Sequence, residues 1–113
     1  MIDNDSQLRM AALKRLSADE QTIFAKITLH DSDGYVRKAA VSRLCDQDML
    51  AEIAIMDTSG GVREHAADRI TNQVLLAEVF NRSGYEPVRR AVLINFTDQT
   101  LLAEIWFFQQ FSG

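Results

Sequence analysis

The sequence predicts an all-α protein built from four two-helix repeats of about 26 residues. A Val-Arg pair recurs at Val36-Arg37, Val62-Arg63 and Val88-Arg89, each 26 residues from the next. Within a repeat, as in residues 36–44, the apolar residues follow the spacing of one helix face. The alternation typical of half-buried strands is absent throughout. Repetition together with a helical period therefore predicts stacked helix pairs.

Further columns keep the same register, and most hold one residue type or close relatives. Among them are Leu50, Leu76 and Leu102; Glu52, Glu78 and Glu104; and Asp46, Asn72 and Asp98, each of which is followed by glutamine. A looser copy with a two-residue insertion at 17–20 opens the chain. The register predicts one domain, 1–113, with repeats at about 3–30, 31–56, 57–82 and 83–110.

Helices are predicted at about 5–16, 18–29, 34–45, 47–56, 60–71, 73–81, 86–96 and 98–110. Residues suited to cap helix N-termini precede most of them: Asp33, Asp46, Ser59, Asn72 and Asp98. Ser17-x-x-Glu20 is interpreted as a capping box for the second helix. Helices this short are marginal alone, so their cohesion must come from contacts between neighbouring layers.

Composition narrows the function classes. The chain has 113 residues, 47% hydrophobic and 25% charged, which excludes disorder. A net charge of −4 disfavours nucleic acid and anionic membranes as partners. One cysteine cannot close an internal disulfide, and no cluster of Cys and His predicts a metal site. No apolar run is long enough to cross a membrane. We therefore predict a cytoplasmic protein with no catalytic residue, cofactor or metal.

The segment from Asp31 to Leu44, DSDGYVRKAAVSRL, resembles the HEAT-like repeats in their short bacterial, phycobilisome-lyase-type form. The resemblance covers about residues 3–108, although Ser83 replaces the aspartate in the last repeat. It implies a right-handed α-α superhelix whose second helices line the concave face. The function it implies first is a protein–protein interaction scaffold or adaptor. A bilin-lyase-like enzyme or lyase subunit and a DNA-binding repeat protein are the alternatives.

Four arginines occupy one column: Arg9, Arg37, Arg63 and Arg89. Asp3, Asp31 and Asp57 each precede an arginine of this column by six residues. The favoured interpretation is a structural ladder between repeats, in which each guanidinium bridges a loop carboxylate and backbone carbonyls. The alternative is a phosphate-binding strip, for which Arg89 would be the first residue to test, because Ser83 stands where the others have an aspartate.

Glu52, Glu78 and Glu104 form a row on the second helices, where Lys26 stands in the first repeat. If these helices line the inner surface, the row predicts an acidic stripe suited to a basic segment of a protein partner. The alternative is an ordinary solvated helix face.

The last predicted helix gathers four aromatic residues, Trp106, Phe107, Phe108 and Phe111. Trp106 belongs to a column predicted to lie in the core, whereas nothing in the repeat requires Phe107 and Phe108 to be covered. Repeat arrays normally end in a polar cap, so this helix predicts a homo-oligomer, a docking surface or truncation from a longer array. The alternative is that the aromatic side chains fold back over the last core layer. Elsewhere, His65 is expected to be half-buried and Cys45 to be a small buried hydrophobe.

Overall fold

The computed structural model describes residues 4–111, which form eight α-helices and no strand. The prediction of an all-α chain is therefore confirmed for this part of the sequence. The helices are α1 (Asn4–Arg15), α2 (Gln21–His30), α3 (Gly34–Val41), α4 (Gln47–Met56), α5 (Gly60–Asp68), α6 (Gln73–Arg82), α7 (Glu86–Asn95) and α8 (Gln99–Phe111).

The first helices of the middle repeats end about four residues earlier than predicted. After α3, the N–H of Arg43 donates to the carbonyl of Ala40, and that of Leu44 to the carbonyl of Val41. Bonds of this three-residue span tighten the chain and take it out of the α-helix. Cys45 consequently lies in a loop and is exposed, so the prediction of a buried cysteine was wrong.

Most predicted helix caps are confirmed. Asp33 accepts a hydrogen bond from Tyr35 N–H and Ser59 from Val62 N–H. Asp46, Asn72 and Asp98 each accept one from the backbone N–H three residues later. The predicted capping box is wrong, because α2 begins only at Gln21 and its N-cap residue, Glu20, makes no side-chain cap bond. The two inserted residues lengthen the loop instead of extending the helix.

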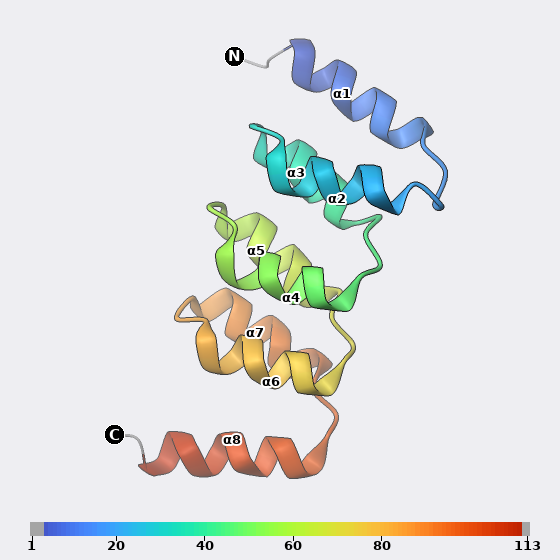
Figure 1. Ribbon diagram of the computed structural model, residues 1–113. Helices are drawn as coiled ribbons and strands as arrows, with labels where there is room; N and C mark the ends of the chain where they lie inside the picture. Colours follow the sequence, from blue (N-terminus) through green and yellow to red (C-terminus); the bar gives the residue numbers. More distant parts are fainter. Residues whose placement is uncertain (1–3, 112–113) are drawn as a thin grey trace.

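Helices pack most closely across the predicted repeat boundaries. Each second helix packs against the first helix of the next repeat: α2 against α3, α4 against α5, and α6 against α7 (Figure 1). The loops within these pairs are short, whereas longer loops join α3 to α4 and α5 to α6. α1 and α8 remain as single helices at the two ends of the molecule (Figure 1). The structural unit is thus offset by one helix from the sequence repeat.

The pairs are arranged in two layers. α1, α3, α5 and α7 pack in succession, and α4 packs against α6 (Figure 1). The molecule is elongated, with extents of 50 × 31 × 18 Å. Its apolar core runs between the layers and contains the predicted columns, such as Leu44 with Ile70 and Leu50 with Leu76, all at most 1% exposed. No helix among residues 4–111 is both long and apolar enough to cross a membrane.

Candidate interaction surface

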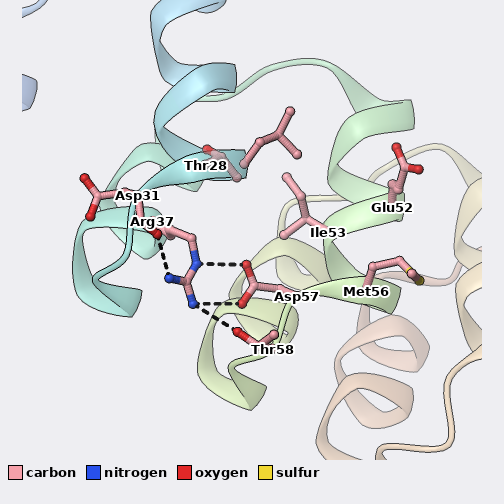
Figure 2. Close-up of a pocket in the computed structure, with 9 residues that line it drawn as sticks. Thr28, Asp31, Arg37, Glu52, Ile53, Met56, Asp57 and Thr58 are labelled. Carbon is pink, nitrogen blue, oxygen red and sulfur yellow. Dashed lines mark hydrogen bonds and ion pairs between the residues drawn. The ribbon is translucent and has the colours of Figure 1, made fainter.

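The arginine column connects consecutive repeats through aspartates. Arg9 Nε lies 2.8 Å from Asp31 Oδ2, and Arg37 Nε lies 3.1 Å from Asp57 Oδ2 (Figure 2). Each arginine therefore takes its carboxylate from the following repeat. The residue six positions earlier supplies its backbone carbonyl: Arg37 Nη1 donates to Asp31 O at 2.9 Å. Asp3, the first aspartate of the predicted ladder, lies outside the described residues.

The last two arginines of the column stack on aromatic rings instead. Arg63 donates to Asp57 O at 2.6 Å, and its guanidinium carbon lies 4.6 Å from the centroid of Tyr85. Arg89 donates to the carbonyls of Phe80 and Ser83 and lies 3.9 Å from the centroid of Phe80. Ser83 is the residue that would have supplied the carboxylate to Arg63. These contacts favour the ladder over a phosphate-binding strip.

Two aspartates in the loop before α3 have lowered pKa values. Burial raises the pKa of Asp31, but hydrogen bonds from Arg9 and from the N–H of Asp33, with the nearby guanidinium charges, outweigh it and lower the pKa overall. The pKa of Asp33 is lowered first by the hydrogen bond from Tyr35 N–H and then by one from Ser6. Both carboxylates stay ionised at neutral pH because the fold binds their charged form.

Glu52, Glu78 and Glu104 are exposed on α4, α6 and α8. Glu52 borders a hollow of about 350 Å³ whose lining includes Leu29, Ile53, Met56 and Asp57 (Figure 2). A second hollow of about 290 Å³ lies between α4 and α6. Glu52 and Met56 border both hollows, so the two hollows lie next to each other on either side of these residues.

The charge on this surface is unevenly neutralised. Glu78 pairs with Arg82 one turn later at 3.0 Å, with both side chains about half exposed. Glu52 makes no ion pair with any described residue. A second acidic residue, Asp48, borders the same hollow and adds to its negative charge. Glu104, Phe107 and Phe108 line a separate hollow on α8. We call the surface formed by Glu52, Glu78 and Met56 the acidic face. It offers carboxylates beside exposed apolar groups.

The terminal aromatic side chains do not fold back over the core. Trp106 is 64% exposed, Phe107 54% and Phe108 65%. The prediction that Trp106 lies in the core is therefore wrong. In the earlier repeats, the first helix of the next repeat packs beside the residue at this position. No described helix lies beside α8 in this way. Phe107 and Phe108 contact each other edge to face, with centroids 6.3 Å apart. The side chain of Phe111 lies outside the described residues.

Sequence reasoning missed the role of the glutamine that follows each second-helix N-cap. Gln47 Nε2 donates to the carbonyl of Arg69, and its Oε1 accepts from the N–H groups of Thr71 and Asn72. Gln21 and Gln73 make the same bridges to residues 22 to 25 positions later. The signal was the glutamine column itself, because a helix-surface residue need not recur unless it makes a recurring contact.

His65 is half-buried, as predicted, and forms a 2.6 Å hydrogen bond through Nε2 with the hydroxyl of Ser42. Burial, followed by the charges of Lys38 and Arg69, lowers the pKa of His65. The histidine therefore connects α3 and α5 in its neutral form at physiological pH.

No group of three potential metal-ligating side chains occurs within residues 4–111. Comparison with protein-family models, with curated proteins and with solved structures gives no match for this chain.

Proposed function

We propose that the chain is a HEAT-like repeat protein, coiled as a right-handed α-α superhelix, that acts as a non-enzymatic interaction module. In this proposal, the acidic face binds a basic segment of a protein partner. The support is that the two hollows adjoin: Glu52 and Met56 border both, and Glu78 borders the second. A carboxylate beside a methionine suits a lysine or arginine side chain, whose stem is apolar and whose end is charged.

The spacing of the glutamate row indicates the form of the segment. α4 packs against α6, and packed helices lie about 8–10 Å apart, so Glu52 and Glu78 present charges at roughly this interval. A segment in the polyproline II conformation advances about 3.1 Å per residue with three residues per turn, so every third side chain lies on the same side and meets the next glutamate. We expect a segment with basic residues at every third position, and apolar residues between them that contact Met56.

The test is fluorescence anisotropy with a labelled twelve-residue peptide that carries lysine at every third position. A peptide of the same composition with its lysines clustered is the control for non-specific charge attraction. Affinity for the spaced peptide is expected to be higher and to fall as salt is added. Equal affinities for the two peptides would contradict the proposal.

Protein variants locate the binding. The double variant Glu52→Gln/Glu78→Gln is expected to weaken binding of the spaced peptide about tenfold, since each exposed charge contact contributes up to about 1 kcal/mol. Asp19→Asn/Glu64→Gln makes the same change of net charge at exposed positions away from this face and should bind normally. Arg82→Gln should strengthen binding, because it releases Glu78 from its ion pair. Equal weakening by both double variants would contradict the assigned surface.

A further inference from the structure

α1 exposes apolar side chains at positions that are buried in every other first helix. Leu8 is 68% exposed, whereas its counterparts in the next three repeats are at most 1% exposed. Ala12 is also exposed, although its counterparts are fully buried. The counterparts are Val36, Val62 and Val88 for Leu8, and Ala40, Ala66 and Val92 for Ala12.

α8 shows the same exception at the opposite end of the molecule. Trp106 is 64% exposed, and the three residues that occupy its position in the preceding repeats are between 0% and 4% exposed. These residues are Thr28, Ala54 and Phe80. Leu93 of α7 is likewise 42% exposed, whereas Val41 and Ala67 at the same position are fully buried.

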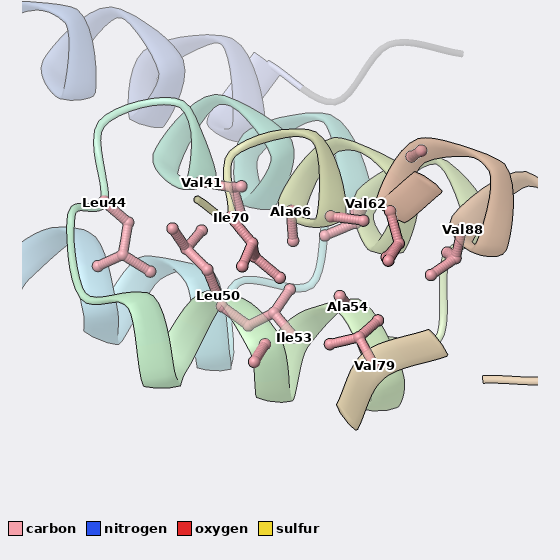
Figure 3. Close-up of a cluster of buried hydrophobic side chains, with 14 of the residues drawn as sticks. Val41, Leu44, Leu50, Ile53, Ala54, Val62, Ala66, Ile70, Val79 and Val88 are labelled. Carbon is pink, nitrogen blue, oxygen red and sulfur yellow. The ribbon is translucent and has the colours of Figure 1, made fainter. Parts of the chain in front are cut away.

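The two exposed surfaces are the two halves of one contact that the fold already makes three times. In the pairs α2–α3, α4–α5 and α6–α7, a second helix packs against the first helix of the next repeat. Figure 3 shows Ala54 of α4 and Val62 of α5 pointing into one apolar interior, which is the contact that Trp106 and Leu8 would make. Within the described residues, α1 has no second helix before it and α8 has no first helix after it.

Each end of the molecule also has a polar side chain that lacks the hydrogen bonds made by its counterparts in the other repeats. Gln99 occupies in α8 the position of the bridging Gln47 and Gln73, yet it is exposed and makes no hydrogen bond with any described residue. Arg15 of α1 corresponds to Arg43, whose guanidinium donates to the carbonyls of Leu13 and Leu16 in the preceding repeat. Arg15 is also exposed and has no partner within residues 4–111.

We propose that α8 of one molecule packs against α1 of a second copy, as α6 packs against α7, so that molecules associate head to tail. Trp106 then covers Leu8 and Ala12 of the second copy. By the repeat register, Gln99 bridges to the end of α1 in that copy, and the copy's Arg15 donates to the carbonyl of Phe96. Because the two surfaces differ, the contact is heterologous, and it extends into a chain of molecules unless its rotation closes a ring.

Charge favours this pairing over a symmetric contact between two α8 helices. Arg9 is neutralised by Asp31, so the remaining charges described on α1 are Lys14 and Arg15 against Asp5, whereas α8 carries the single charge of Glu104. Head-to-tail packing places opposite net charges together. A symmetric α8 pair would place like charges together and leave the apolar surface of α1 exposed to water.

Sedimentation equilibrium of the full chain and of two blocking variants tests the proposal. Leu8→Glu blocks only α1, and Trp106→Glu blocks only α8. Each variant alone should remain monomeric, whereas an equimolar mixture should form a dimer of twice 12.8 kDa and stop there, because both remaining ends are blocked. The unmodified chain should grow beyond the dimer as its concentration rises. Val74→Glu, at a 71% exposed position on α6, should associate like the unmodified chain.

Three results would overturn the proposal: an unmodified chain that stays monomeric throughout the concentration series, a Leu8→Glu variant that still forms dimers alone, or a mixture that forms no dimer. The second result would indicate a symmetric α8 contact. Circular dichroism melting curves that match the unmodified chain establish that both variants fold, as expected for exposed positions. Peptide binding by the acidic face can be measured on monomeric Leu8→Glu, so the two proposals can fail separately.

Discussion

Arg37 and Asp57 form an enclosed ion pair that joins two consecutive repeats. Arg37 Nε and Asp57 Oδ2 are 3.1 Å apart, and the two side chains are only 12% and 7% exposed. A second guanidinium nitrogen contacts the other carboxylate oxygen at 3.2 Å, so the pairing is bidentate. Removal of one partner from such a pair leaves a charge without compensation in a largely dry environment.

Arg37→Ala should therefore lower the free energy of unfolding by about 3 kcal/mol, because Asp57 keeps its charge and loses its partner. Arg90→Ala is the matched control, since the Arg90–Glu86 pair is 75% and 66% exposed. Its loss should change stability by less than about 0.5 kcal/mol. Urea denaturation of both variants checks the difference. Similar small effects would mean that the arginine column does not stabilise the stack.

Substitution of the two neighbouring glycines at the start of α5 should have opposite effects. A Cβ on Gly60 would lie 2.5 Å from Tyr85 Oη, so Gly60→Ala must displace the ring on which Arg63 stacks. We expect a loss of about 1–2 kcal/mol from this overpacking. A Cβ on Gly61 meets nothing closer than Ser59 Oγ at 3.8 Å, and Gly61→Ala should gain about 0.5 kcal/mol from helix propensity. Thermal denaturation of the two variants shows whether each substitution raises or lowers stability. Stabilisation by Gly60→Ala would contradict the placement of Tyr85.

Stability should decrease as the pH falls below the ordinary histidine value of 6.5, because the pKa of His65 is lowered in the folded chain. The unfolded chain then binds a proton that the folded chain resists, so the contribution of His65 is complete above about pH 6.5 and is lost towards the lower folded pKa. His65→Ala, which restores the alanine of the other repeats, should flatten this part of the profile. Urea denaturation across the range compares the slopes. An unchanged slope in the variant would show that His65 is not the group responsible.

The glutamine bridges should contribute measurably at internal positions. Gln47→Ala removes hydrogen bonds to three backbone groups of the next repeat and should cost about 2 kcal/mol. Gln99→Ala, at the same repeat position but without such bonds, should leave the stability of the monomer unchanged. Guanidinium denaturation at low protein concentration separates the two cases. Equal effects would indicate that the glutamine acts only through helix propensity.

Much of the fold could be predicted from the sequence because it follows from local patterns. The helical period and the cap residues Asp33, Asp46 and Asn72 set where helices lie and where most begin. The ends of α3 and α5 could not be predicted, because cross-repeat hydrogen bonds occupy carbonyls there. The side-chain amide of Gln21 donates to the carbonyl of Arg43, and the guanidinium of Arg69 donates to the carbonyl of Leu44, in place of further helical bonds at these carbonyls.

The candidate site was less predictable because its contacts cross between repeats. The spacing of Asp31 and Arg37 suggested a partner six residues away, whereas the carboxylate on Arg37 comes from Asp57, twenty residues later. Trp106 was expected in the core because its column is buried, but burial depends on which helix lies beside it. Neither the pairing of Arg37 with Asp57 nor the exposure of Trp106 can be predicted from neighbouring residues in the sequence.

The same set of contacts recurs at each step of the repeat. A nuclear Overhauser experiment on the isotopically labelled protein at low concentration can detect these contacts in solution. We expect cross-peaks from the side-chain amide groups of Gln21, Gln47 and Gln73 to the backbone amides of Cys45, Thr71 and Thr97, respectively, and none of this kind from Gln99. Absence of these cross-peaks from the internal glutamines, or contacts in a different register, would show that the repeats do not share one set of contacts.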